Sequence, residues 1–160
     1  MKERIMQKMI VYPGQTRSDI AHFLKVYAFA EEIGKLESLD ARTQEILEIA
    51  AIVHDIACPL CRKKYGNTYG KHQEEESEAL LREFFFDIAI DEAMKERIIF
   101  LVCHHHTYTG VVGLDWQILL EADFLVNADE SNKYANVVSQ FEKNVFRTNS
   151  GKLFLKSMYE

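Results

Sequence analysis

The chain has 160 residues, of which 48% are hydrophobic and 28% are charged. This composition supplies enough apolar surface for a core and is not typical of a disordered chain. The length fits one domain over residues 1–160. Asp and Glu outnumber Lys and Arg by 25 to 19, which gives a net charge of -6. This charge disfavours broad binding to a nucleic-acid backbone or an anionic membrane, so we expect a small ligand and no long nucleic acid.

The sequence also indicates a cytoplasmic location. No apolar run approaches the roughly 18 residues that span a bilayer. Glu3 and Gln7 interrupt the N-terminal segment where a signal peptide would be apolar. The three cysteines are an odd number and fit a reducing compartment better than secretion. The pattern does not define an oligomeric state.

The spacing of apolar residues predicts an all-α fold, a single helical bundle of five or more helices. These residues recur mostly at intervals of three and four positions, and only two prolines and seven glycines interrupt the chain. The first expected helix begins at Ser18 or Asp19, either of which can cap it, and ends at Ile33 before a glycine. Asp40 can cap the second helix, which we expect to end near Asp55.

The rest of the chain gives a less regular pattern. Residues 57–71 contain proline, asparagine and two glycines, and we expect them to form a long interior loop. Further helices are expected over 72–86, over 91–106, from Leu114 through Asp123 and, with weaker periodicity, over 134–146. The residues from Arg147 onward are expected to form a turn and a short terminal element.

Side chains that can bind metal ions fall on or beside the apolar stripes of three expected helices. His22 shares a face with apolar residues, His54 continues the stripe of the second helix with Asp55 at its edge, and Asp123 lies among large apolar residues. A buried, unpaired carboxylate costs on the order of several kcal/mol, so Asp123 should ionise only beside a cation or strong donors. Nitrogen and oxygen ligands from three helices suit a divalent transition-metal ion. Taken alone, each histidine could instead be a hydrogen-bonded core residue.

A run of three histidines, His104, His105 and His106, ends the fourth expected helix. Consecutive residues of a helix project about 100° apart, so at most two of them can converge on one point. His105 and His106 continue the apolar stripe of this helix, so His104 is the one expected to point away from the common site. The alternative is a polar helix end exposed to solvent.

Two further motifs give weaker signals. Cys58 and Cys61 have a spacing that could hold zinc or form a redox pair, but the chain offers no second cysteine pair and no βαβ pattern, which favours a packing role. The basic cluster Arg62, Lys63 and Lys64 could bind phosphate or be solvated, and the sequence favours neither.

The order of these motifs resembles the HD superfamily of metal-dependent phosphohydrolases. The segments are IAHFLKVYAFA around His22, AAIVHDIA around His54 and Asp55, VCHHHTYTG, and EADFLVNADE around Asp123. The resemblance covers residues 18–130 and leaves 131–160 as a C-terminal helical extension. It implies an all-α core around one or two divalent transition-metal ions (Fe, Mn, Zn, Co or Ni).

The resemblance also implies a set of metal ligands. The first ion would be held by His22, His54, Asp55 and Asp123, with Asp55 able to bridge to a second ion. Relatives with two metals supply further histidines, for which the candidates are His72, His105 and His106. The family pattern places one of them four positions before a small residue, and counting back from Ser77 gives Gln73 instead of His72. His72, Gln73 or Glu76 could take that place, or a single metal could suffice.

The activity implied is hydrolysis of a phosphate ester or anhydride, with a nucleotide as the expected small substrate. A bound ion would acidify a water molecule and polarise a phosphoryl oxygen, and Asp55 would orient that water or accept its proton. His105 or His106 would protonate the leaving oxygen. The non-reacting phosphates would be neutralised by residues such as Lys25, Arg62, Lys63 and Lys64.

Two alternatives are kept beside this hypothesis. Some members of the superfamily hold a di-iron centre and act as oxygenases, which requires two redox-active ions. A non-catalytic module could use the same pocket to bind a nucleotide or a protein. The intact set of four ligands favours an enzyme over such a module.

Overall fold

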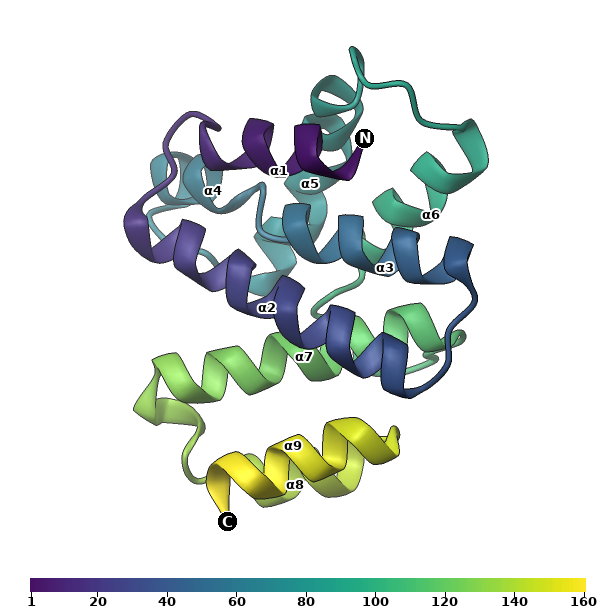
Figure 1. The fold of residues 1–160 in the computed structure, drawn as a ribbon. Helices are drawn as coiled ribbons and strands as arrows, with labels where there is room; N and C mark the ends of the chain where they lie inside the picture. The colour runs from purple at the N-terminus through teal and green to yellow at the C-terminus, as the bar shows by residue number, and fades with distance from the viewer.

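A computed structural model describes residues 1–160, apart from the side chain of Lys133. The described chain forms nine α-helices and one 3-10 helix, without strands, so the all-α prediction is confirmed (Figure 1). The elements are α1 (Lys2–Ile10), α2 (Arg17–Leu36), α3 (Ala41–Val53), α4 (Cys58–Tyr65), α5 (Gly70–Phe84), α6 (Glu92–Cys103), α7 (Leu114–Glu130), η1 (Asn132–Tyr134), α8 (Val138–Asn144) and α9 (Asn149–Tyr159).

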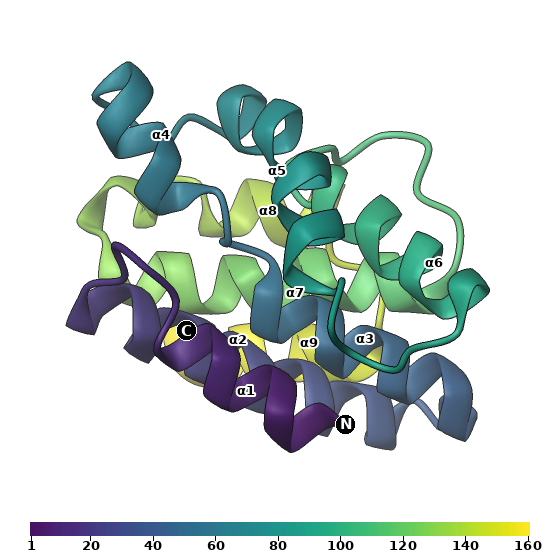
Figure 2. The same cartoon turned by 90° about the horizontal axis from the view of Figure 1, so that it is seen from above.

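Two buried helices organise the bundle. α3 contacts α1, α2, α6 and α7, and all of its residues from Ile46 to Val53 are buried. α7 is buried from Asp115 to Val126, between α2 and α3 on one side and α9 on the other. In Figure 1, α1 lies above this pair and α8 with α9 lies below it. Seen from above, α4 and α6 stand on opposite sides of α5 (Figure 2).

The helix starts follow local capping chemistry. α2 begins earlier than expected, because the hydroxyl of Thr16 accepts a hydrogen bond from the backbone of Asp19 at 3.0 Å, and the Asp19 carboxylate accepts one from the backbone of Thr16 at 2.9 Å. Asp40 caps α3 as predicted, and Asp91 caps α6 in the same way. Gly34 does not end α2, which continues to Leu36.

Several expected boundaries were wrong. The expected loop 57–71 contains α4, since Pro59 lies in the first turn of that helix, where its missing N–H is not needed, and Gly66 ends the helix with φ of 72°. α5 begins at Gly70 instead of His72. α6 ends at Cys103, so the three histidines occupy the turn that follows it. The sequence analysis missed α1 and expected a shorter terminal element than α9.

None of the helices in the described part of the chain is long and apolar enough to cross a membrane. The described side chains place the core around α2, α3, α6 and α7, and α1, α5 and α9 add residues at its edges.

A buried carboxylate ties the C-terminal helix to α7. Glu121 is fully buried, and its oxygens accept hydrogen bonds from the Thr148 hydroxyl at 2.6 Å and from the backbone N–H groups of Arg147 and Thr148 at 3.1 and 3.2 Å. Burial raises the pKa of Glu121 although these donors oppose the shift. Gly151 allows the close approach, because a Cβ there would overlap the Glu121 carboxylate and lie 2.7 Å from the Thr148 hydroxyl oxygen.

We expect Gly151→Ala to destabilise the protein by about 1–3 kcal/mol through overpacking. Replacing glycine by alanine inside a helix usually increases stability. A decrease in stability would therefore report the contact with Glu121. The measurement is the free energy of unfolding in urea. Lys152→Ala, at the next position of α9, is the control and should change stability by less than about 0.5 kcal/mol. A stabilised Gly151→Ala protein would contradict the assignment.

Candidate metal centre

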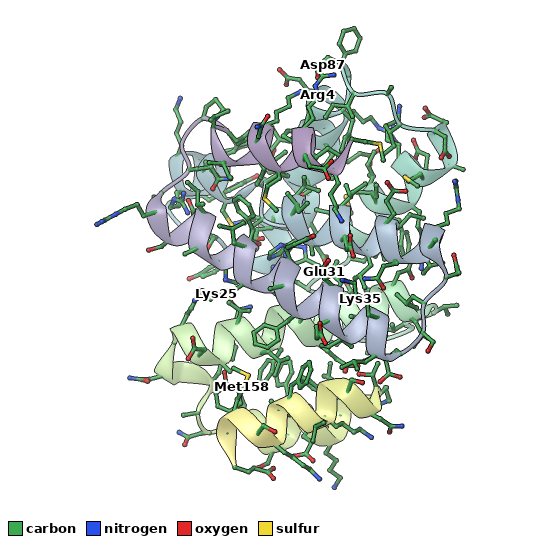
Figure 3. All side chains as sticks on the ribbon, in the orientation of Figure 1. Arg4, Lys25, Glu31, Lys35, Asp87 and Met158 are labelled. Carbon is green, nitrogen blue, oxygen red and sulfur yellow. The ribbon has the colours of Figure 1, made fainter. Side chains whose placement is uncertain are left out.

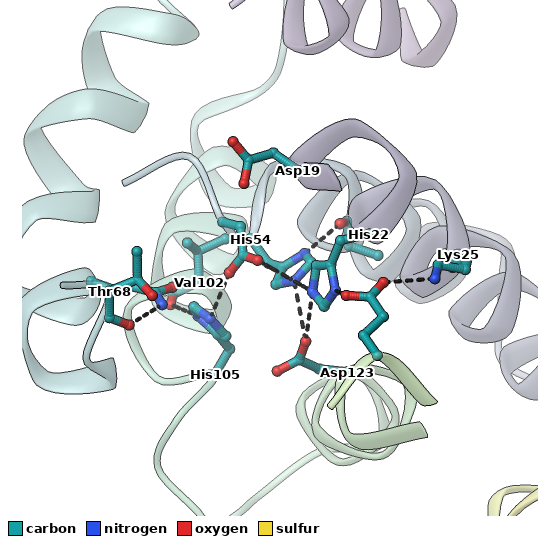
Figure 4. Close-up of polar contacts among 12 residues, drawn as sticks. Asp19, His22, Lys25, His54, Thr68, Val102, His105 and Asp123 are labelled. Carbon is teal, nitrogen blue, oxygen red and sulfur yellow. Dashed lines mark hydrogen bonds and ion pairs between the residues drawn. The ribbon is translucent and has the colours of Figure 1, made fainter. Parts of the chain in front are cut away.

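The polar residues that the sequence placed on separate helices converge inside the bundle. His22 comes from α2, His54 and Asp55 directly follow α3, and Asp123 comes from the middle of α7 (Figure 4). The backbone leaves the α-helix after Val53 and forms a turn, which lets the adjacent His54 and Asp55 face the same point. His22, His54 and Asp123 are buried, whereas 20% of the Asp55 side chain is exposed.

Two imidazole nitrogens lie at metal-ligand spacing from each other and from both carboxylates. Nε2 of His22 lies 3.2 Å from Nε2 of His54, and these two nitrogens lie 3.2 and 3.3 Å from Oδ1 of Asp123. Oδ2 of Asp55 lies 3.2 and 3.4 Å from the same nitrogens. Ligand atoms about 2.0–2.2 Å from one ion lie roughly 3.0–3.5 Å from each other. The four side chains therefore fit a divalent ion and could hold one.

Hydrogen bonds at the opposite ring nitrogens fix the orientation of these imidazoles. Nδ1 of His54 lies 2.7 Å from the carbonyl oxygen of Ala51, to which it can only donate. Nδ1 of His22 lies 3.0 Å from Oε2 of Glu130. With Nδ1 as the donor, the Nε2 atom of each ring is the one that faces the carboxylates, and it would supply the lone pair to a bound metal ion. Glu130 was missed by the sequence analysis, although it lies seven positions after Asp123 on the same face of α7.

The electrostatics of the cluster favour a positive charge at its centre. Burial lowers the pKa of His22, but the hydrogen bond with Asp123 and the charges of Asp55 and Glu130 outweigh it and raise the pKa to about 10. Burial likewise raises the pKa of Asp55 and Asp123, yet the neighbouring imidazoles hold both pKa values below their usual range. Both carboxylates are therefore acceptors for a cation near neutral pH.

A second group of ligand atoms adjoins the first. Nε2 of His105 lies 3.4 Å from Oδ1 of Asp55, and Nδ1 of His105 donates to the carbonyl of Val102 at 2.6 Å. The Nε2 atoms of His105 and His106 are both buried without a hydrogen-bond partner among the described atoms. Ligand atoms of His105, His106 and Asp123 lie within 4.8 Å of one another, so this group could hold a second ion.

The remaining histidines lie apart from these two groups. His104 stacks on Phe100 with ring centroids 4.1 Å apart, and its Nδ1 donates to the carbonyl of Phe100. His72 stacks on Tyr65 at 3.8 Å, and its Nδ1 contacts the side-chain oxygen of Asn67. Gln73, one position further along α5, is buried and lines the cavity at the metal centre.

The first turn of α5 also holds the segment that carries His106, a contact that the sequence analysis missed. A carboxylate oxygen of Glu74 accepts hydrogen bonds from the backbone of His106 at 3.1 Å and from the hydroxyl of Thr107 at 2.9 Å. A Cβ at Gly70 would lie 2.7 Å from the ring of His106, so only glycine permits this approach. Burial and the neighbouring His105 lower the pKa of His106 to about 4.

The basic residues expected to bind phosphate are mostly paired with acidic neighbours. Lys25 lies 2.7 Å from Glu130, Arg62 lies 2.5 Å from Asp19, and Lys64 lies 2.6 Å from Glu76. Lys63 lines a different cavity, between α1, α4 and α5. The structure therefore does not bring these four cations together at the metal centre.

The two cysteines of α4 are free thiols, and both are buried. Cys58 lines the cavity at the metal centre. Burial and the charge of Asp55 raise the pKa of this thiol, which disfavours the reactive thiolate. These contacts agree with a packing role for the pair.

We expect Glu130→Gln to weaken binding of a divalent transition metal by about 10- to 100-fold, because Glu130 orients His22 and increases its basicity. Competition against a chromogenic chelator measures the dissociation constant. Asp129→Asn, an exposed carboxylate at the preceding position, should leave that constant within about twofold. Equal affinities for Glu130→Gln and the unmodified protein would show that Glu130 does not support the metal centre.

Comparison with known proteins supplies the family. The profile of the HD domain matches residues 19–139. A solved structure of similar fold is the crystal structure of a predicted HD superfamily hydrolase from an uncultured Thermotogales bacterium, with a TM-score of 0.64 and 23% sequence identity over 99% of this chain and 83% of that chain. The search of curated proteins gave no match. The profile match extends over most of the sequence, and the chain belongs to the HD domain family.

Proposed function

We propose that the protein is a metal-dependent phosphohydrolase that cleaves a phosphate ester or anhydride with water. The observation that carries this proposal is the convergence of His22, His54, Asp55 and Asp123, three of which (His22, Asp55 and Asp123) line a cavity of about 340 Å³. A cation bound at this point would offset the cost of burying two carboxylates beside the imidazole nitrogens. The cavity gives a small substrate access to that point. The solved relative of similar fold, itself named a predicted hydrolase, supports the same reaction class by analogy.

The residues of the chain divide the work of hydrolysis between them. When bound, a divalent ion supplies Lewis acidity to water and to a phosphoryl oxygen. Asp55 is the most exposed member of the ligand set, and its carboxylate can accept a hydrogen bond from the attacking water and orient it. His106 lines the cavity with Nε2 unpartnered among the described atoms, so it can contact the leaving oxygen. His105 adjoins Asp55, with its Nε2 3.4 Å from Oδ1 of that carboxylate.

We expect Asp55→Ala to lose hydrolysis by roughly a thousandfold or more, because it removes both a metal ligand and the group that orients water. The test measures phosphate release from a panel of phosphate esters and anhydrides, and metal content by mass spectrometry, on protein purified without chelator. Asp87→Ala is the control, because Asp87 pairs with Arg4 on the far surface (Figure 3) and its loss should leave turnover within about twofold.

The outcomes separate the alternatives. Metal-dependent phosphate release that Asp55→Ala abolishes supports the proposal. Tightly bound iron with oxygen consumption and no phosphate release would indicate an oxygenase. Protein that binds metal and a nucleotide without turnover would indicate a binding module. Absence of metal from the unmodified protein, even after reconstitution, would overturn the proposal.

A further inference from the structure

The charge of the cavity at the metal centre limits the substrates that it can accept. Among the described side chains, four carboxylates line it, from Asp19, Asp55, Asp123 and Glu130, against a single guanidinium, that of Arg62. Arg62 and Lys25 pair with two of these carboxylates, and one divalent ion would balance the other two, which leaves no excess of positive charge for further phosphates. A triphosphate would bring several further negative charges into this space, whereas a phosphomonoester brings at most two.

The cations around the cavity are already engaged. Both terminal nitrogens of Arg62 donate hydrogen bonds to the Asp19 carboxylate, at 2.5 and 3.1 Å. One of them also lies 3.3 Å from the carbonyl oxygen of Gly14. Lys25 is held by Glu130 on the other side of His22. Arg and Lys side chains are the usual partners of protein-bound phosphates. A second or third phosphate would therefore have to break existing ion pairs. The reacting phosphate would not, because a metal ion would bind it.

The rest of the lining contains neutral hydrogen-bonding groups, and Gln73 is the most constrained. Only 5% of Gln73 is exposed, and its Nε2 donates to the carbonyl of Thr68 at 2.7 Å. That bond fixes the amide, so Oε1 can only accept, and it is buried without a partner among the described atoms. A buried acceptor left unpaired is unfavourable, and a ligand that donates to it removes that cost. The position favours a ligand that brings a hydroxyl donor.

Three smaller polar side chains extend this surface. Ser18, Asn127 and Ser131 line the same cavity, and their side chains make no hydrogen bond to the described residues. Hydroxyl and amide groups can each donate and accept, which matches the hydroxyl groups of a sugar. The volume of about 340 Å³ is near the lower end of the range for ligand cavities, roughly 300–1,000 Å³.

We propose that the substrate is a phosphorylated sugar carrying a single phosphate, and that Gln73 determines specificity by accepting a hydrogen bond from a sugar hydroxyl. This inference rests on the proposed phosphohydrolase function and narrows its substrate class. In the reaction, a water oxygen bonds to phosphorus as the bond between phosphorus and the sugar oxygen breaks. One water proton ends on the sugar oxygen, and no oxidant or reductant takes part.

The first experiment compares substrates on the unmodified, metal-loaded protein. Ribose 5-phosphate should be hydrolysed with a kcat/KM at least about tenfold above the values for ATP and for butyl phosphate. ATP tests the charge limit, and butyl phosphate is a monoester without hydroxyl groups. A preference for ATP, or equal values for ribose 5-phosphate and butyl phosphate, would overturn the inference. This comparison does not depend on the folding of any variant.

The second experiment tests Gln73 itself. Gln73→Leu should lower kcat/KM for ribose 5-phosphate by about 10- to 100-fold while leaving that for butyl phosphate within about twofold. Gln140→Leu, the same change at an exposed position of α8, is the control and should alter neither value. Equal losses with both substrates would show that Gln73 has only a structural role and would overturn its assignment.

A binding measurement separates this inference from the proposed function. Calorimetry with ribose 5-phosphate and metal-loaded protein should detect binding that Gln73→Leu weakens by about tenfold. Such binding without hydrolysis of any ester would overturn the proposed function and support the sugar-phosphate site. Hydrolysis of butyl phosphate with no binding or turnover of ribose 5-phosphate would support the proposed function and overturn the sugar-phosphate site. Neither binding nor hydrolysis would overturn both.

Discussion

The structure is organised around a buried point at which negative carboxylates face imidazole lone pairs. Asp123 lies in the most buried helix of the bundle, and no apolar environment tolerates its charge alone. His22 and His54 approach it with Nε2 because their Nδ1 atoms are committed to Glu130 and to the backbone of Ala51. This set could hold a metal ion, and the contacts that hold its side chains in place also join α2, α3 and α7.

The helices that deliver these ligands are held by buried polar contacts as well as by the apolar core. Lys2 of α1 pairs with the buried Glu48 of α3 at 2.5 Å. Glu121 of α7 accepts a hydrogen bond from Thr148, the residue that caps α9. Each contact joins a peripheral helix to one of the two central helices. These contacts restrict movement of the central helices and so keep the ligand atoms at the spacing that a metal ion needs.

The chemistry of the cavity follows from the pairing of charges rather than from their number. The family resemblance implied phosphate-binding roles for several basic residues, but Lys25, Arg62 and Lys64 each have an acidic partner. Several polar residues that line the cavity are neutral, and one of them, Gln73, has a buried acceptor oxygen without a partner in the described structure. The metal centre and this neutral lining together favour a compact ligand with one phosphate and several hydroxyl groups.

Helical periodicity and motif order are readable along the chain, so they were enough to predict the all-α class and the family. Periodicity also placed His22, His54 and Asp123 toward the core, and the family resemblance added Asp55 to them. The sequence also identified His104 as the histidine that faces away. The contact of Glu130 with His22, the presence of α4 in the expected loop and the stacking of His72 on Tyr65 became visible only in the folded chain. These features depend on contacts between residues far apart in the chain or on the exact end of a helix, and periodicity does not encode either one.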